Sequence, residues 1–342
     1  MTKYHNINPI ISGVGMALPD NEMSNNALIE REKMFSNDEW IREHTGIEKR
    51  FFAGNNVFTS DLAIVAAKMA LAQSGIGIQK LSAIYLGTIT PDYPSPSTAS
   101  LVHKAINAPE EDCTALDISG ACAGGIASLE LAVMKVQNNP NQAALAIGAE
   151  TLSNRTNFND RSTAILFGDG AGAVVVENKP DSHQPVFSSM VRSDPASISI
   201  PAGGIREVPN GFSYPRGKIH MNGPAVKKAA IEIMCKTAIS VAKKADIYNP
   251  RYGINWQEVD YFIPHQSNLR ISDALGKELQ VPKNKQINTV IKHGNTSAAS
   301  AFLALAQTQI DKQLRPRTYR LFFTSVGIGF VGTAALIDFQ LT

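Results

Sequence analysis

Residues 115–132 read ALDISGACAGGIASLELA, and residues 288–306 read NTVIKHGNTSAASAFLALA. Each stretch has a short apolar segment, a turn of small residues and then apolar residues at helical spacing. This pattern predicts a strand, a tight elbow and a helix. A second pair repeats in the same order, because the glycine turn and strand at 168–176 (GDGAGAVVV) is similar to 327–337 (GIGFVGTAALI). Two pairs of similar segments in the same order indicate that the chain holds two diverged copies of one α/β unit.

The boundary between the copies is predicted near residues 178–186, where Asn, Lys, Pro, Asp, Ser and His crowd together. We therefore expect one half at 1–180 and the other at 181–342. Around the elbows, continuously apolar segments alternate with segments of helical spacing, which predicts a mostly parallel α/β sheet covered on both faces. Strands are expected near residues 9, 83, 115, 144, 172, 261 and 319, and helices at 60–72, 126–136, 225–243 and 298–310.

Composition limits the class of protein. Hydrophobic residues make up 44% of the 342 residues and charged residues 18%, which argues against disorder. Lys and Arg number 32 against 30 Asp and Glu, so there is no general electrostatic case for binding nucleic acid or an anionic membrane. No apolar run approaches the roughly 18 residues of a membrane span. We expect a cytoplasmic globular protein.

The three cysteines are Cys113, Cys122 and Cys235, and no two of them form a CxxC pair. A disulfide framework and a cysteine zinc site are therefore not indicated, and a reducing compartment fits. Cys122 alone lies at a small-residue elbow, where a helix N-terminus would stabilise a thiolate. It is either a nucleophile or a buried structural cysteine, and the local sequence leaves both interpretations open.

His265 and Asn295 become informative beside Cys122. His265 follows the apolar run 261–263, and open α/β sheets place ligand-contacting groups at strand ends, although a histidine in a loop is the simpler interpretation. Asn295 lies at the second elbow, where a helix N-cap is the simpler interpretation. Together the three can converge between the halves as a nucleophile and two hydrogen-bond donors for an oxyanion or enolate. The glycine run at 168–173 leads into a strand and lacks a GK[ST] ending, so it is not a phosphate loop, and no metal motif is present.

At these residues the sequence resembles the β-ketoacyl-acyl-carrier-protein synthase III family of the thiolase superfamily. The likeness covers essentially the whole chain, and the resemblance implies a five-layered α/β/α/β/α fold of two pseudo-repeated halves in a homodimer. The motifs occur in the family's order: 38–47 (DEWIREHTGI), 121–124 (ACAG), 160–173 (DRSTAILFGDGAGA), 265–270 (HQSNLR), 293–300 (HGNTSAAS) and the C-terminal glycine turn.

The resemblance also implies a reaction. The family transfers an acyl group from acyl-CoA to a cysteine, here Cys122, and condenses it with malonyl-acyl-carrier-protein by a decarboxylative Claisen step. His265 and Asn295 would donate hydrogen bonds to the malonyl thioester oxygen, and the backbone N–H groups of Cys122 and Ile328 would hold the oxyanion. No metal or cofactor is implied, because acyl-CoA is a substrate and loss of CO₂ drives the step.

Other residues match the family's binding positions. By position, Trp40 and Arg161 would sandwich the adenine of coenzyme A, and Asn268 would line the pantetheine tunnel. Lys228 and Arg270 would receive the acidic carrier protein, although a solvated helix face explains Lys228 equally well.

Five positions depart from the family pattern. His44 stands in place of an arginine near the adenine, Pro224 in place of a tunnel asparagine, and Ile328 in place of the middle glycine of the C-terminal turn. Ser95 replaces an aromatic that closes the acyl pocket across the dimer, and Gly332 replaces a tryptophan. The loss of two large residues predicts an acyl pocket larger than an acetyl group requires.

Three alternatives remain. One is a secondary-metabolite ketosynthase, of the polyketide or quinolone type, with an unusual acyl group or acceptor. Another is an inactive partner subunit of a ketosynthase heterodimer, which the retention of Cys122, His265 and Asn295 argues against. The third, a hydroxymethylglutaryl-type synthase, would need a glutamate near the nucleophile, and the elbow at 119–125 contains none.

Overall fold

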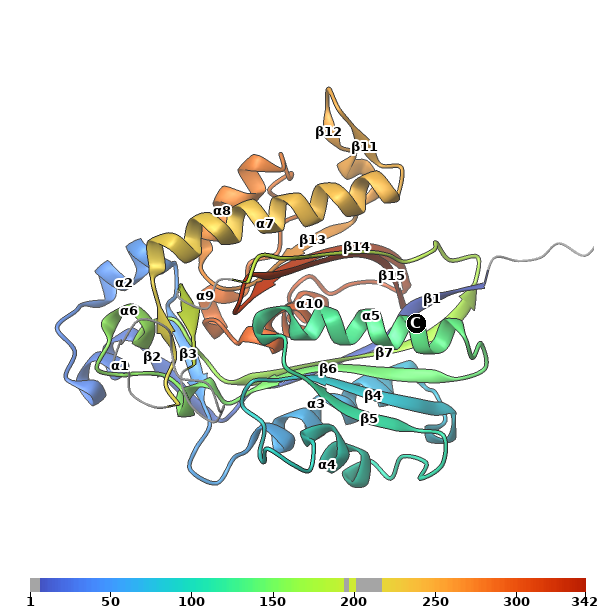
Figure 1. The fold of residues 1–342 in the computed structure, drawn as a ribbon, viewed down its shortest axis with the longest axis horizontal. Coiled ribbons are helices and arrows are strands. Elements are labelled where there is room, and N and C mark those ends of the chain that lie inside the picture. Colours follow the sequence, from blue (N-terminus) through green and yellow to red (C-terminus); the bar gives the residue numbers. More distant parts are fainter. Residues whose placement is uncertain (1–6, 194–196, 201–216) are drawn as a thin grey trace, which may run out of the picture.

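The structure, a computed structural model, describes residues 7–193, 197–200 and 217–342. Its helices and strands stack in five layers, α/β/α/β/α, as the family resemblance implied (Figure 1). Within the described residues, no helix is long and apolar enough to cross a membrane.

The first half of the chain forms one layer of strands with helices on both faces, and a single register pair between β1 and β15, Ile11 with Phe339, joins it to the strands of the second half. Its strands lie in the order β5-β4-β6-β7-β1; α3 and α4 cover the outer face and α5 covers the inner face. Gly13 and Gly15 let α3 lie directly on the β1 backbone, because a Cβ at either position would collide with a carbonyl oxygen of that helix. The bounds are β1 Ile7–Ala17, α3 Thr59–Ser74, β4 Leu81–Gly87, α4 Thr98–Ala105, β5 Thr114–Ile118, α5 Gly124–Gln137, β6 Ala143–Glu150 and β7 Gly170–Pro180.

The second half repeats this plan. Its strands lie in the order β13-β14-β15-β8, α7 and α8 cover the outer face, and α10 covers the inner face. These strands take the places of β4, β6, β7 and β1, which confirms the two pseudo-repeated halves. The bounds are β8 Val186–Val191, α7 Gly223–Lys244, β13 Tyr261–Pro264, α8 Leu269–Glu278, α10 Ser300–Asp311, β14 Arg317–Gly327 and β15 Val331–Leu341. The division at 180/181 falls between β7 and β8 and stays a prediction.

The sheets are mixed, whereas the sequence predicted mostly parallel strands. β7 runs antiparallel to β6 and β1, and β15 runs antiparallel to β14 and β8. The pairs β4–β5, β4–β6 and β13–β14 are parallel. The chain returns from β14 to β15 through residues 328–330 alone, and so short a connection can join only antiparallel neighbours. Apolar runs show that a strand is buried but not its direction.

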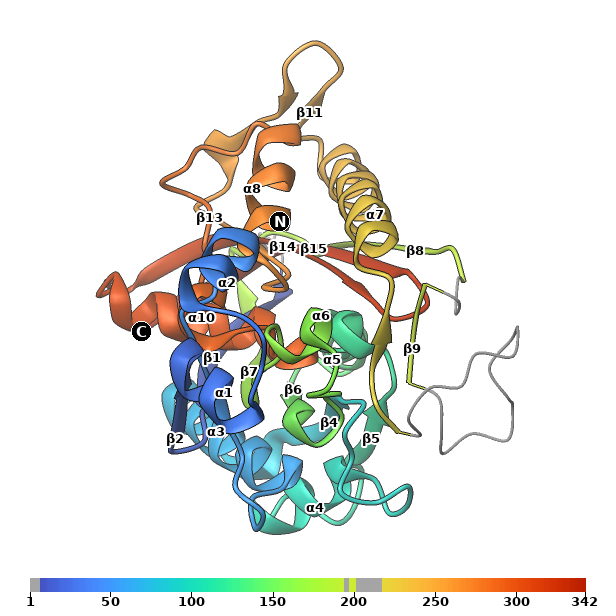
Figure 2. The same cartoon turned by 90° about the vertical axis from the view of Figure 1, so that its left-hand side faces the viewer.

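Helices α5 and α10 form the middle layer, side by side between the sheets (Figures 1 and 2). A short 3₁₀ elbow precedes each: η2 (Ala121–Ala123) before α5 and η5 (Ser297–Ala299) before α10. Ala121 and Ser297 occupy matching positions and both have left-handed φ values, 46° and 48°. Such a conformation costs a non-glycine residue about 1–3 kcal/mol, and both copies retain it.

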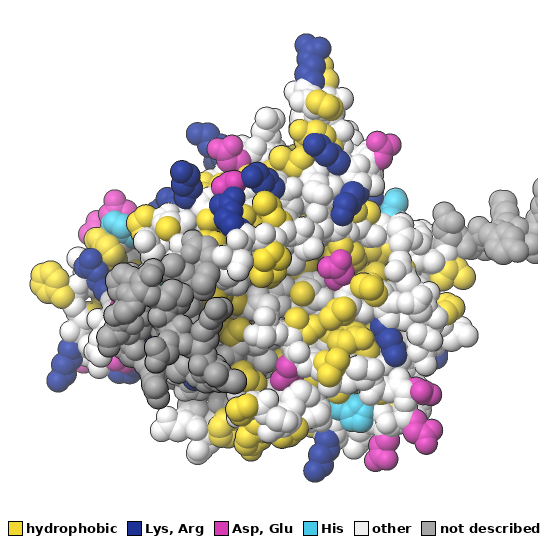
Figure 3. All heavy atoms as spheres, in the orientation of Figure 1, with side chains coloured by type: hydrophobic (Ala, Val, Ile, Leu, Met, Phe, Trp, Pro, Cys, Tyr) yellow, Lys and Arg dark blue, Asp and Glu magenta, His cyan; other side chains and the backbone are white. Residues whose placement is uncertain are grey.

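The first sheet ends at β5, and apolar side chains gather over α5 beside that edge (Figure 3).

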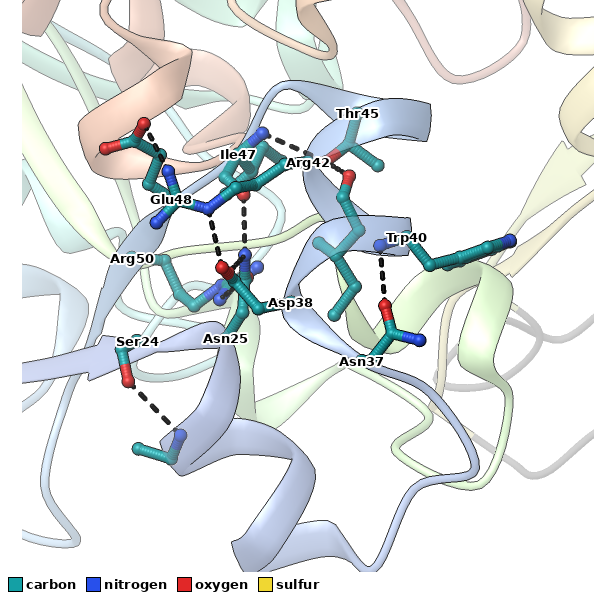
Figure 4. Close-up of polar contacts among 12 residues, drawn as sticks. Ser24, Asn25, Asn37, Asp38, Trp40, Arg42, Thr45, Ile47, Glu48 and Arg50 are labelled. Carbon is teal, nitrogen blue, oxygen red and sulfur yellow. Dashed lines mark hydrogen bonds and ion pairs between the residues drawn. The ribbon is translucent and has the colours of Figure 1, made fainter.

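A buried arginine fixes the N-terminal flap against the first half. Arg50 is fully buried and donates to Asn25 Oδ1 and to the carbonyl oxygen of Ile165, both at 2.7 Å (Figure 4). Asn25 in turn donates to Asp38 Oδ1, at 2.7 Å, which holds α2 beside the loop that follows α6. The flap consists of β2 Asn21–Ser24, α1 Asn25–Glu32, α2 Asp38–Thr45 and β3 Lys49–Phe52.

The remaining elements are short. They are η1 Ile78–Lys80, η3 Leu152–Asn154, α6 Arg161–Ala164, β9 Ile198–Ser199, β10 His220–Met221, β11 Tyr248–Asn249, β12 Gly253–Ile254, η4 Trp256–Glu258 and α9 Val290–His293.

Candidate active site

A largely apolar cavity of about 380 Å³ runs between the two halves of the chain. Residues of α2, α7 and α8 line it, and Cys122, His265 and Asn295 line it together with Ile328. The sequence placed these residues far apart, and the fold brings them to one cavity. An apolar cavity with a few polar groups is the usual form of a small-molecule site.

Cys122 lies on the η2 elbow immediately before α5. A Cβ on Gly87 would collide with the backbone of Gly124, so the elbow packs directly on the end of β4. Burial raises the pKa of the Cys122 thiol to about 12; the Ser297 hydroxyl lowers it and the charge of Glu150 raises it further. The thiol is therefore protonated at neutral pH, although the helix N-terminus favours its thiolate.

The C-terminal turn fixes the backbone around Cys122. Ser325 Oγ donates to the carbonyl oxygen of Cys122 at 2.7 Å. A Cβ on Gly327 would collide with the Gly120 carbonyl oxygen and would lie 3.3 Å from Cys122 N, so β14 ends against the elbow itself. The next residue, Ile328, lines the cavity. The Cys122 and Ile328 peptides are thus neighbours, as the predicted oxyanion pair requires.

His265 follows β13 and is almost fully buried. Its backbone N–H donates to the carbonyl oxygen of Thr324 at 2.7 Å, and Nδ1 lies 3.0 Å from Ser300 Oγ at the start of α10. Burial lowers the pKa of His265 to about 4, so the imidazole is neutral at pH 7. If the Ser300 hydroxyl donates to Nδ1, the ring proton is on Nε2, where it can be donated to a ligand.

Asn295 uses its two amide atoms differently. Oδ1 accepts a hydrogen bond from the backbone N–H of Ser297 at 2.9 Å and so closes the turn before η5, whereas the N-cap residue of η5 is Thr296 and not Asn295. Among the described residues Nδ2 has no hydrogen-bond partner, and the side chain lines the cavity. The same asparagine can therefore hold this turn through Oδ1 and offer Nδ2 to a ligand.

At the predicted adenine site, the side chains of Arg161 and His44 lie against the Trp40 ring and occupy the space beside it. Arg161 Cζ lies 4.2 Å from the centre of the Trp40 ring, and His44 stacks on Trp40 with ring centroids 4.1 Å apart. An adenine between Trp40 and Arg161 would have to push the two apart. His44, which stands in place of the expected arginine, stacks on the tryptophan.

Of the predicted tunnel and carrier residues, Asn268 and Arg270 line the cavity and Lys228 does not. Asn268 caps α8 by accepting from Arg270 N at 2.8 Å, and it also donates to the carbonyl oxygen of His44 at 3.3 Å. Arg270 Nε donates to the carbonyl oxygen of Glu43 at 2.7 Å, so this guanidinium caps α2. Both residues line the cavity, whereas Lys228 is exposed on α7 and its neighbour Lys227 lines the cavity instead.

The two predicted acyl-pocket residues lie outside this cavity wall. Ser95 is exposed, and its proposed role is in the pocket of a partner chain. A Cβ on Gly332 would collide with Ile233 of α7, so this position faces a helix in the second half. Their roles in the acyl pocket stay predictions.

Sequence reasoning missed three buried polar residues: Ser297, which lines the cavity, Ser300, which contacts His265, and Glu150. Ser297 and Ser300 lie inside the quoted HGNTSAAS motif but carried no assigned role. Glu150 ends β6 and is fully buried, near enough to raise the pKa of Cys122. The signal was a lone acidic residue at the end of a continuously apolar strand. The elbow itself holds no glutamate, but the fold supplies one from β6.

Comparisons with known proteins identify the family of the chain. The family described as 3-oxoacyl-[acyl-carrier-protein] synthase III matches residues 116–195, and its C-terminal family matches residues 250–339. The β-ketoacyl-[acyl-carrier-protein] synthase III of Symbiobacterium thermophilum is 36% identical over 90% of this chain and 92% of its own length.

Two solved structures are similar over nearly all of the chain. The synthase III of Thermus thermophilus has a TM-score of 0.87 and 31% identity, over 97% of this chain and 99% of its own. The priming β-ketosynthase of the R1128 polyketide pathway has a TM-score of 0.85 and 26% identity, over 98% and 97%.

Proposed function

The chain belongs to the β-ketoacyl-acyl-carrier-protein synthase III family of carbon–carbon bond-forming acyltransferases, and from this premise we propose that Cys122 is its acylated nucleophile. The observation that carries the proposal is the convergence of Cys122, His265 and Asn295 on one apolar cavity. In the first half-reaction, the Cys122 sulfur attacks the thioester of an acyl-CoA, and coenzyme A leaves. The Cys122 and Ile328 N–H groups stabilise the oxyanion.

In the second half-reaction, malonyl-acyl-carrier-protein replaces coenzyme A in the cavity. His265 Nε2 and Asn295 Nδ2 donate to its thioester oxygen, so the enolate formed by loss of CO₂ is stabilised as it develops. The enolate carbon attacks the acyl-enzyme and yields a β-ketoacyl thioester. Both donors are neutral, and the reaction needs neither a metal nor a redox cofactor, because decarboxylation supplies the carbanion.

The outer part of the cavity is suited to coenzyme A and the carrier protein. Arg161 moves off the Trp40 ring, and the adenine then binds between the two side chains. Asn268 contacts the pantetheine. Lys228 and Arg270, with Lys227 at the cavity wall, supply positive charge for the acidic carrier protein. A local basic surface can steer an acidic partner even though the net charge is +2.

The acyl group is larger than acetyl in this proposal. Ser95 leaves space where relatives carry an aromatic from the partner chain, and each extra buried methylene is worth about 0.8 kcal/mol. A second candidate, a secondary-metabolite ketosynthase, is supported by the similarity to the R1128 priming enzyme. Acylation rates with acetyl-, butyryl- and octanoyl-CoA test the pocket size. A large pocket predicts that the longer acyl groups react at least as fast as acetyl, and an acetyl-specific pocket predicts that acetyl reacts fastest.

The nucleophile is tested by intact-protein mass spectrometry after incubation with acyl-CoA. Cys122→Ala should abolish the acyl-enzyme, while Cys113→Ala and Cys235→Ala should retain it, because neither of those residues lines the cavity. His265→Ala and Asn295→Ala should still be acylated but lose decarboxylation by about 10²–10³-fold. Acyl label on the Cys122→Ala protein would rule out the assignment.

A further inference from the structure

Arg50 is a buried cation that has no part in the reaction above. Its side chain is 0% exposed, and its guanidinium donates to Asn25 Oδ1 (Figure 4) and to the carbonyl oxygen of Ile165, each at 2.7 Å. Burial lowers the pKa of Arg50 to about 10, and the charge of Asp38 raises it, so the group stays charged at neutral pH. Both hydrogen bonds are therefore charge-assisted, which makes them about twice as strong as bonds between neutral groups.

Residues 165–168 hold Asn295 by its backbone. The Asn295 N–H donates to the carbonyl oxygen of Leu166 at 2.8 Å, and the Asn295 carbonyl oxygen accepts from the Gly168 N–H at 3.0 Å. Because Asn295 Oδ1 is bound by the Ser297 N–H at 2.9 Å, the position of this backbone fixes where Nδ2 points. A shift of residues 165–168 would therefore displace the donor that the condensation needs.

Arg50 also packs against both of these segments. A Cβ on Gly168, or on Gly294 directly before Asn295, would lie 3.1 Å from the Cβ of Arg50. There is thus no room for the two segments to approach Arg50 further, and the bond from the guanidinium to Ile165 prevents one of them from moving away.

We propose that Arg50 is a positioning residue for the condensation step: it holds residues 165–168 in place and so keeps Asn295 Nδ2 directed at the malonyl thioester oxygen. Arg50 itself does not line the cavity, so it acts through Asn295. It also joins this segment to the flap, since its partner Asn25 donates to Asp38 at the start of α2 (Figure 4). The inference rests on the proposed function, because it requires Asn295 to act in decarboxylation.

Arg50→Met and Arg50→Lys test this role through the two half-reactions. Both variants lose the forked pair of bonds, because a lysine ammonium lacks the planar fork of arginine. Decarboxylation of malonyl-acyl-carrier-protein should become about 10- to 10²-fold slower in each, since a displacement of about 1 Å can have that effect. Acylation of Cys122 by saturating butyryl-CoA, followed by mass spectrometry, should stay within about twofold of wild type, because Asn295 serves the second step.

A double variant and two further variants show whether Arg50 acts through Asn295. Arg50→Met should slow decarboxylation no further in the Asn295→Ala background, where Nδ2 is already absent. Asn25→Ala keeps the charge and the bond to Ile165 but frees the other arm of the guanidinium. It should cause the same imbalance to a smaller degree, even if the Arg50 variants fail to fold. Arg320→Met is the matched control: its Nε is likewise buried and unpaired within the described residues, but it lies on β14 away from the cavity wall, so the ratio of the two rates should not change.

Two results would overturn the positioning role. The first is decarboxylation at the wild-type rate in Arg50→Lys, which would leave only the charge of Arg50 to matter. The second is an equal loss of both half-reactions in Arg50→Lys and Asn25→Ala, as a general loss of structure predicts. If Asn295→Ala itself decarboxylates at the wild-type rate, the proposed function of Asn295 fails, and this inference fails with it.

Discussion

Ser300 contacts His265 and lies where it can decide which ring nitrogen carries the proton. The pair is buried, and Nδ1 lies 3.0 Å from Ser300 Oγ. Ser300→Ala should leave Nδ1 unpaired and let the proton move to it, which removes the donor at Nε2. Because an unsatisfied buried polar group costs about 1–3 kcal/mol, we expect decarboxylation of malonyl-acyl-carrier-protein to fall about 5- to 150-fold.

The half-reactions separate this positioning role from a general loss of structure. Acylation of Cys122, followed by mass spectrometry, should stay within about twofold of wild type, since the imidazole acts in the second step. Ser300→Thr keeps the hydroxyl and should restore decarboxylation. Equal loss of both half-reactions would assign Ser300 to packing alone.

Glu150 also predicts a pH dependence of stability. Its pKa in the folded protein, about 7, lies above its value of roughly 4.3 in an unfolded chain. The carboxyl therefore stabilises the fold most fully below pH 4.3, and this contribution is lost as the pH rises through 7. Glu150→Gln should raise the free energy of unfolding by about 1–3 kcal/mol at pH 8.5 relative to its effect at pH 5. Urea denaturation at the two pH values measures the difference, and an equal effect at both would contradict a raised pKa.

At the residue scale, the sequence predicted site residues that lie in recognisable motifs. It missed residues that reach the site only because the chain packs distant segments together. Cys122 and Asn295 lie at small-residue elbows, and His265 ends an apolar strand, so each has a local signal. Glu150 has almost no local sequence signal, because it lies near the site only where β6 ends beside η5. The pKa of Cys122 was likewise hidden, since burial is a property of the packed chain.

At the scale of elements, the two elbows are the part of the fold that places the chemistry. Both have a left-handed residue before the helix, and they pack against each other; η5 also packs against β6, and η2 packs against β14. Small residues at the elbows could be recognised from the sequence, as could the order of strands and helices. The antiparallel direction of β7 and β15 could not, because it depends on connections rather than on apolar pattern.

Gly148→Ala tests whether β6 sets the position of η5. A methyl group there would collide with the carbonyl oxygen of Ala298, which is backbone and cannot turn aside. We expect a loss of about 1–3 kcal/mol in the free energy of unfolding. Condensation should fall further than stability explains, because Asn295 and Ser297 would move with η5. Gly77→Ala is the matched control, since a Cβ there meets no atom within 4 Å; similar losses in both variants would contradict the role of this contact.

At the scale of the whole molecule, the edge strand β5 favours a homodimer, because within the described residues it pairs with β4 alone. The first sheet ends at β5, and Tyr93, Leu116 and Met134 near this edge are 55%, 54% and 54% exposed. An unpaired edge with apolar side chains is a surface that natural proteins pair or cover. A second copy can pair its own β5 there, and such a dimer would carry Ser95 toward the neighbouring cavity.

Leu116→Arg should therefore separate the dimer, because a charged side chain on an edge strand opposes pairing with another strand. Light scattering coupled to gel filtration should show half the wild-type mass. Cys122 lies within its own chain, so the monomer should still be acylated, but its preference among acetyl-, butyryl- and octanoyl-CoA should change if the partner's Ser95 region closes the acyl pocket.

Lys68→Arg, on the outer helix α3, is the control and should leave both mass and preference unchanged. A wild-type protein that is already monomeric would contradict the dimer, and a Leu116→Arg monomer with unchanged chain-length preference would assign the acyl pocket to one chain alone.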